Sequence, residues 1–104
     1  MIITNIEKLS NMEIIEHYGI VSGSTVRSKN FLKDFFAGIK NLFGGELKTY
    51  THLLNESRRE ATLRMIKQAE QLGANAVINV RFATSSITSG ASEIYVYGTA
   101  VKVR

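Results

Sequence analysis

The side chains best suited to metal chemistry are the only two histidines of the chain, His17 and His52. The chain has no cysteine, so it offers no thiolate to a soft heavy metal and forms no disulfide. Neither histidine has a second one at the HxH or HxxxH spacing that would place two nitrogens on one metal ion. We keep both as candidate metal ligands. The alternative is that His17 is an ordinary strand residue and His52 an ordinary helix-surface residue.

The best candidate for catalysis is a small polar segment around Gly23, which contains Ser22, Ser24 and Thr25. No Asp–His partnership that would activate one of these hydroxyls can be identified in the sequence. The segment also lacks the spaced glycines and the lysine of a loop that cradles phosphates. We therefore expect no enzymatic activity, and the sequence indicates no cofactor other than the metal ion considered above.

The composition is that of one globular domain. The chain has 104 residues, of which 44% are hydrophobic and 21% charged, a balance unlike that of disordered proteins. No segment approaches the roughly 18 consecutive apolar residues of a membrane-spanning helix. The first residues, MIITNIEKLS, lack the basic start and apolar block of a secretory signal. We expect a cytoplasmic protein that does not associate with membranes.

The net charge of +4 arises from 13 basic and nine acidic residues. A nucleic-acid-binding protein gathers its basic residues on one face, with aromatic residues between them. Here the basic residues are scattered along the chain and many have acidic neighbours. Nucleic acid is therefore not an expected partner.

Hydrophobic periodicity and turn residues predict an α+β fold with two layers, an antiparallel sheet and two helices on one side of it. A short β-like start is followed by longer strands, over residues 2–5, 13–21, 76–83 and 92–103. Ser22–Ser24 is expected to form a turn, and residues 84–91 a connection rich in Ser, Thr and Gly.

Two helices are predicted between the first long strand and the second. The first covers residues 31–43 and ends at Gly44-Gly45, and the second covers about 50–72 and ends at Gly73. The predicted buried stripe of the second helix consists of Leu54, Ala61, Met65, Ala69 and Leu72. Glu60 and Arg64 have the i,i+4 spacing and order of a favourable ion pair on a helix.

The last strand is apolar on both faces. Ile94, Val96, Gly98 and Ala100 alternate with Tyr95, Tyr97, Thr99, Val101 and Val103. Helices on one side of a sheet cover one of these faces only, so the other would leave an apolar patch of roughly several hundred Å² exposed, which usually marks an interaction surface. We therefore predict a homo-oligomer whose interface contains Val77, Tyr95, Tyr97, Val101 and Val103.

Several short motifs follow one another in an order that resembles the YbjQ-like family of bacteria and archaea. They are Gly19-Ile20-Val21-Ser22-Gly23, Phe35-Phe36-Ala37-Gly38-Ile39, Leu42-Phe43-Gly44-Gly45 with the following Tyr50, Leu72-Gly73-Ala74-Asn75-Ala76, and Gly98-Thr99-Ala100-Val101. The resemblance covers nearly the whole chain, and we assign residues 1–104 to a single domain of this kind. It implies a dodecin-like β-α-β-β subunit that assembles as a ring of five, and a domain often described as heavy-metal-binding.

Such a ring implies two kinds of shared site. It would bring one copy of His17 or His52 from each subunit together near its axis. It would also form clefts between subunits, a common location for small ligands. We expect Tyr50, Arg81, Tyr95 and Tyr97 to line such a cleft, because a tyrosine offers both an apolar ring and a polar tip. The alternatives are that these residues only pack in the interface, and that the ring is purely structural or binds a protein partner.

Overall fold

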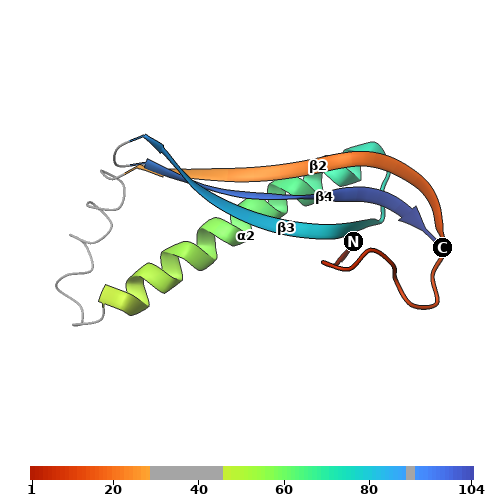
Figure 1. The fold of residues 1–104 in the computed structure, drawn as a ribbon, viewed down its shortest axis with the longest axis horizontal. Helices are drawn as coiled ribbons and strands as arrows, with labels where there is room; N and C mark the ends of the chain where they lie inside the picture. Colours follow the sequence, from red (N-terminus) through yellow and green to blue (C-terminus); the bar gives the residue numbers. More distant parts are fainter. Residues whose placement is uncertain (29–45, 89–90) are drawn as a thin grey trace.

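The computed structural model describes residues 1–28, 46–88 and 91–104. In these residues one helix packs on a four-stranded sheet with the strand order β1-β3-β4-β2 (Figure 1). The elements are β1 (Ile2–Ile3), β2 (Ile14–Ser28), α2 (Glu46–Leu72), β3 (Ala76–Thr88) and β4 (Ala91–Val103). The predicted two-layer α+β fold is confirmed. The helix predicted over residues 31–43 lies outside the described residues.

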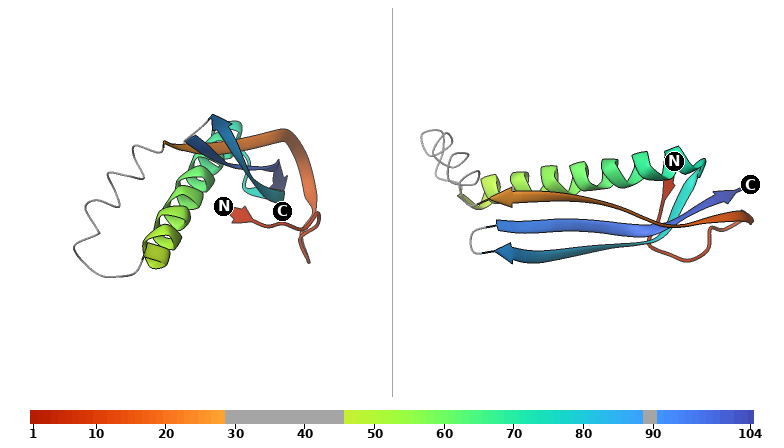
Figure 2. Two further views of the ribbon diagram at one scale, coloured as in Figure 1. Left: turned by 60° about the vertical axis from the view of Figure 1, so that its left-hand side comes forward. Right: turned by 90° about the horizontal axis from the view of Figure 1, so that it is seen from above.

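The sheet is mixed rather than wholly antiparallel. β4 pairs antiparallel with β2 on one side and with β3 on the other, as expected. β1, however, pairs parallel to β3. The Ile2 N–H donates to the Asn75 carbonyl (3.1 Å) and the Thr4 N–H to the Val77 carbonyl (3.0 Å). The start of the chain thus lies beside β3, and the loop after it leads around to β2 (Figure 2).

Two polar segments that were predicted as a turn and a connection belong to strands instead. β2 continues through Ser22–Ser24, and β3 continues through residues 84–88. Gly23 is needed there because α2 lies very close: an added Cβ would collide with the Ala61 carbonyl oxygen and lie 2.6 Å from the Met65 nitrogen. The glycine marks a close approach of two backbones rather than a turn.

The buried stripe of α2 repeats every four residues: Leu53, Ser57, Ala61, Met65 and Ala69. The predicted stripe was wrong at its two ends, where Leu54 and Leu72 are exposed. The prediction placed these two leucines on the buried side of the helix because they are large and apolar. The actual stripe contains small residues because they let the helix backbone approach β2. The side chain of Thr25 on β2 confirms this approach, because its hydroxyl donates to the Ser57 carbonyl (3.1 Å).

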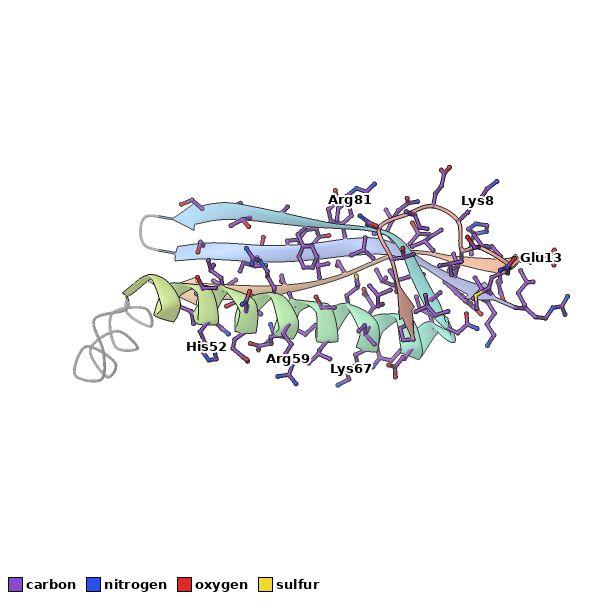
Figure 3. All side chains as sticks on the ribbon, turned by 90° about the horizontal axis from the view of Figure 1, so that it is seen from below. Lys8, Glu13, His52, Arg59, Lys67 and Arg81 are labelled. Carbon is purple, nitrogen blue, oxygen red and sulfur yellow. The ribbon has the colours of Figure 1, made fainter. Side chains whose placement is uncertain are left out.

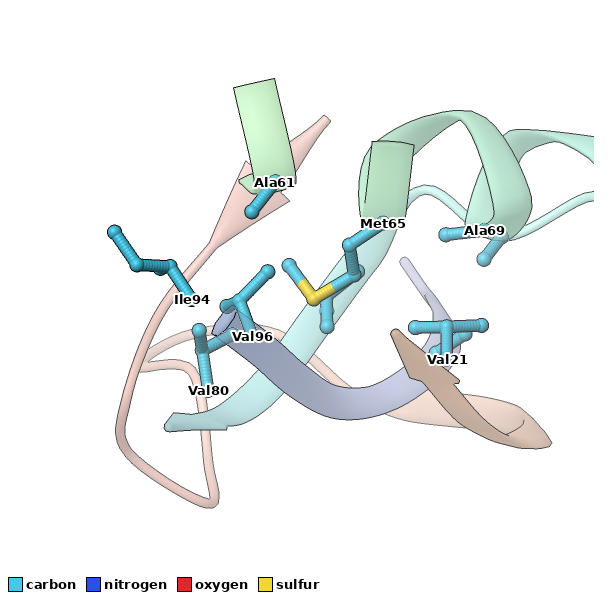
Figure 4. Close-up of a cluster of buried hydrophobic side chains, with 10 residues drawn as sticks. Val21, Ala61, Met65, Ala69, Val80, Ile94 and Val96 are labelled. Carbon is cyan, nitrogen blue, oxygen red and sulfur yellow. The ribbon is translucent and has the colours of Figure 1, made fainter. Parts of the chain in front are cut away.

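The main core lies between α2 and the sheet (Figure 4). It contains Val77, Val80, Val96 and Met65 among its buried side chains. Val77 was predicted on the opposite, exposed face, and this was wrong. It stands opposite Ala100 of β4, so both side chains point toward α2.

A second core lies on the other face of the sheet, beneath the N-terminal segment. Ala76, Ile78, Val101 and Val103 are buried there, with Ile2, Leu9 and Ile14 packed against them. The prediction that Val101 and Val103 lie on an exposed face was therefore wrong. Their own chain covers them, because the segment before β2 crosses this end of the sheet.

Candidate functional site

Beyond the N-terminal segment, the face of the sheet turned away from α2 has no cover from the described residues. Direct partners in an antiparallel sheet share a face, so the register assigns the members of this surface, which we call the open face. They are Ile20, Ser22, Ser24 and Val26 of β2, Glu93, Tyr95 and Tyr97 of β4, and Arg81, Ala83 and Ser85 of β3. Ile20 is 77% exposed and Val26 51%. Exposed apolar side chains gathered on one face are typical of a surface that binds a ligand or another protein.

The centre of the open face is a pair of tyrosines. The rings of Tyr95 and Tyr97 stack with their centroids 5.5 Å apart and their planes at 28°. Tyr97 is 38% exposed, and Tyr95 is half-buried. The small residues Ser22 and Ser24 stand opposite them on β2, which leaves the rings accessible from above. Two stacked rings at the middle of the open face form a platform for another planar group.

Arg81 lies directly beside this platform, opposite Tyr97 on β3. Its Nη1 donates to the Asn5 carbonyl (2.8 Å) and to the Val80 carbonyl (3.0 Å). These two bonds hold the side chain at the border between the N-terminal segment and the open face. Because both start from one nitrogen and the residue is exposed, the other edge of the guanidinium faces solvent. The residue that carries this cation is thus the direct cross-strand neighbour of Tyr97.

A bulge in β3 places Arg81 on this face. The pairing with β4 shifts between Ile78 and Arg81, where Asn79 adopts a left-handed backbone with φ of 54°. The Asn79 N–H donates to the Ile6 carbonyl (3.1 Å) and the Val80 N–H to the Thr4 carbonyl (3.0 Å), so the N-terminal segment holds the bulge in place. One extra residue moves every later side chain to the opposite face. The site therefore depends on the fold of the first six residues.

A second group of charged residues joins α2 to β2. Glu60 bonds to Arg27 (2.8 Å) and to Arg64 (2.6 Å), the latter being the predicted i,i+4 pair. The hydrogen bond from Arg27 lowers the pKa of Glu60 below its usual value; partial burial opposes this shift and the charge of Arg64 adds to it. Every charge of this cluster is used in attaching the helix to the strand, so its role is structural.

A model of the YbjQ family, described as "Putative heavy-metal-binding", matches residues 1–104. The chain belongs to the YbjQ family. The resemblance inferred from the motifs is thereby confirmed. A UPF0145 protein of Hahella chejuensis is 60% identical over 101 residues, which cover 97% of both chains. Another, from Archaeoglobus fulgidus, is 51% identical over 104 residues, which cover all of this chain and 96% of the relative.

A solved structure supports the YbjQ fold found here. It is the crystal structure of a protein of unknown function from Pediococcus pentosaceus that belongs to the DUF74 family. The two folds superpose with a TM-score of 0.65 and 16% sequence identity, covering 100% of this chain and 98% of the other. At this identity the comparison supports the fold alone.

The candidate metal ligands of this YbjQ protein lie apart. His17 lies on β2, opposite Val101 of β4. His52 is exposed on α2, on the side away from the sheet (Figure 3). In the described ranges, no three His, Cys, Asp or Glu side chains lie close enough to hold a metal ion. Within one chain, then, the two histidines do not form a common site.

Three of the four candidate ligand-binding residues, in contrast, lie close to one another. Arg81, Tyr95 and Tyr97 lie together on the open face, whereas the side chain of Tyr50, in the first turns of α2, is outside the description. Ser22 and Ile20 were missed as members of this surface because their segment was interpreted as leading into a turn. Over the described part of the chain, no helix combines the length and apolar character required to cross a bilayer.

Proposed function

We propose that this YbjQ family member is a cytoplasmic homo-oligomer that binds a small planar anion on the open face, between subunits. The observation that carries the proposal is the position of Arg81 directly beside the stacked pair of Tyr95 and Tyr97. We propose a ring of five subunits, following the family resemblance. The proposal includes no reaction, since no catalytic group has been assigned.

The class of ligand follows from the side chains. A planar ring would stack on the exposed face of Tyr97, and base–aromatic stacking of this kind contributes about 1–3 kcal/mol for each ring. A carboxylate or phosphate on that ring would meet the outer edge of the Arg81 guanidinium, whose forked donors match both groups. Neutral or cationic planar molecules would lack this second contact. An anionic aromatic molecule therefore fits the site best.

Oligomerisation is proposed because one chain gives such a ligand too little cover. Sites for small molecules usually enclose most of the ligand surface, whereas the open face is one side of three paired strands. Exposed Ile20 and Val26 surround the tyrosines on the same face. A second subunit over these side chains would cover the apolar surface and enclose the ligand in one step.

Native mass spectrometry of tag-free protein purified from cells tests both the oligomerisation and the ligand binding. We expect the mass of an assembly carrying a bound adduct, and loss of the adduct in Arg81→Gln. Arg59→Gln is the matched control, because Arg59 is an exposed arginine on α2 pointing away from the sheet (Figure 3). An assembly that never carries an adduct would favour a structural or partner-binding ring. A mass of one chain would refute oligomerisation.

A metal ion is the second candidate ligand, favoured by the description of the YbjQ family model. Because the two histidines are separate within one chain, a metal site would need His17 or His52 from several subunits. Isothermal titration with zinc, nickel and copper would test this, with His17→Ala and His52→Ala as variants. Binding no tighter than millimolar in the unmodified protein would exclude a physiological metal.

A further inference from the structure

The two outer edges of the sheet differ in how their backbone groups are occupied. On β2, Ser22 and Ser24 direct their backbone groups away from β4, because hydrogen bonding alternates along an antiparallel pair. The Ser22 N–H donates to Gln68 Oε1 (2.7 Å), and Arg64 Nη1 donates to the Ser24 carbonyl (2.5 Å). Both partners are side chains of α2. This part of the β2 edge is therefore closed by the protein's own helix.

The first part of the β3 edge is closed. There the N-terminal segment supplies the partners, and the last of these bonds joins the Val80 N–H to the Thr4 carbonyl (3.0 Å). After Val80, the same alternation directs the backbone groups of Phe82 and Thr84 outward. Neither has a hydrogen-bond partner at this edge among the residues that the structure describes. An open strand edge follows directly after a closed one.

Within the described part of the chain, this open edge has none of the features that keep the edges of monomeric proteins apart. Natural sheets protect such edges with charged residues, proline or a covering element. Residues 82–88 have the sequence FATSSIT, which carries no charge, and the chain contains no proline. α2 does not cover the edge either, because it lies over the opposite side of the sheet, along β2 (Figure 2). Phe82, on the helix side of β3, is consequently 53% exposed.

We propose that the edge of β3 at Phe82 and Thr84 pairs with a strand from a second copy of this chain. The inference rests on the homo-oligomer proposed above and adds a contact at the sheet edge to the proposed contact over the open face. The segment is neutral and rich in residues that favour strands, so it has no charge that would select a different, charged partner. The added strand would also cover Phe82 at the side that α2 leaves open.

The contact would complete the ligand site. Arg81 and Ala83 lie on the open face of the same strand, between the tyrosines and the β3 edge. A strand added at this edge would extend the open face directly beyond Arg81. The anion would then have residues of a second copy beside Arg81, in addition to those of the subunit over the open face.

Thr84→Pro tests the pairing because proline removes the outward N–H of residue 84 and leaves the bonds to β4 in place. Thr84→Ala is the matched control, since it shortens the side chain and keeps the N–H. By size-exclusion chromatography with light scattering, we expect unmodified protein and Thr84→Ala to be assembled and Thr84→Pro to be a single chain. Assembly of Thr84→Pro like that of the unmodified protein would overturn the inference.

Phe82→Lys provides a second test in case the proline variant does not fold. A charge beside an open edge opposes strand addition, and a residue that is 53% exposed tolerates lysine. Leu63→Lys is the control, because Leu63 is 54% exposed on α2. We expect Phe82→Lys to lose the assembly and Leu63→Lys to keep it. Retention of the assembly in Phe82→Lys would contradict the inference.

Amide hydrogen exchange separates this inference from the proposed function. In the assembled protein, the N–H groups of Phe82 and Thr84 should exchange slowly, because both would be paired to the second copy. An assembly in which both exchange rapidly would overturn the edge contact and leave the homo-oligomer standing. An unmodified protein that is a single chain at all concentrations would overturn both.

Discussion

At the scale of single residues, two glycines in the sheet are required by close packing. Gly23 faces the backbone of α2, as described above. Gly98 on β4 is equally crowded: an added Cβ would lie 2.7 Å from Val77 Cγ1 and 2.9 Å from the Ile78 carbonyl oxygen. Both positions are buried strand interiors, where glycine otherwise weakens a strand. The sequence motifs around them therefore report layer packing rather than chemistry.

Gly23→Ala and Gly98→Ala are expected to destabilise the fold by at least about 1–3 kcal/mol each, the usual cost of overpacking. Gly19→Ala is the comparison, because its site has open space but a φ of 99°, so only backbone strain of about 1–3 kcal/mol arises. Urea denaturation at one protein concentration measures all three. A smaller loss of unfolding free energy in Gly23→Ala than in Gly19→Ala would show that α2 moves away from β2 easily.

At the scale of secondary-structure elements, the side chain of Asn75 links the turn after α2 to the end of β4. After Gly73, which has a φ of 91°, the Asn75 Nδ2 donates to the Val103 carbonyl (2.9 Å). The Val103 N–H in turn donates to Asn75 Oδ1 (2.8 Å). The amide thus imitates a strand neighbour and pairs the last residue of β4 before the chain ends.

Asn75→Ala should lower the free energy of unfolding by about 1–3 kcal/mol, because it leaves a partly buried N–H and carbonyl of Val103 without partners. Asn75→Asp keeps the acceptor and loses the donor, so an intermediate stability is expected. Thermal unfolding followed by circular dichroism gives the order of the three proteins. Equal stability of Asn75→Ala and the unmodified protein would show that water replaces the amide.

The ion pair between β2 and α2 predicts a pH dependence. Because the hydrogen bond from Arg27 lowers the pKa of Glu60 in the folded chain, its contribution to stability is fully present above the unfolded pKa of about 4.5. It is lost as the pH falls through the lower folded pKa. Glu60→Gln should therefore be less stable than the unmodified protein at pH 7, with a difference in stability that narrows as the pH falls below about 4.5. Glu56→Gln, exposed on α2, is the control.

An element could be predicted from the sequence where a single residue or a regular pattern decided its local structure. The end of α2 followed from Gly73, and the alternation of β4 followed from a regular apolar pattern. The bulge at Asn79 could not be predicted, because Ala76, Ile78, Val80 and Phe82 read as one continuous face. The structure turns Ile78 to one side and Val80 to the other, since the N-terminal segment pairs with this part of β3.

At the scale of the whole molecule, the N-terminal segment divides one face of the sheet into two parts. The covered part has its own core, in which Val101 is fully buried. The open part contains Ile20, Tyr97 and Arg81, and Arg81 is bonded to the segment through Asn5. The apolar face expected from the last strand thus exists, but it is displaced along the sheet from where the alternation alone placed it.

The open part makes a last prediction about assembly. If a second subunit covers this face, Ile20→Lys should weaken the assembly strongly, because the lysine would bury its charge in the contact. The fold should be unaffected, since Ile20 is 77% exposed within its own chain. Light scattering over a dilution series measures the first effect, and thermal unfolding of the dissociated chain measures the second. Lys8→Ala, on the exposed N-terminal segment, is the control that should change neither. An assembly that tolerates lysine at position 20 would show that the subunits meet elsewhere and that the ligand platform faces water.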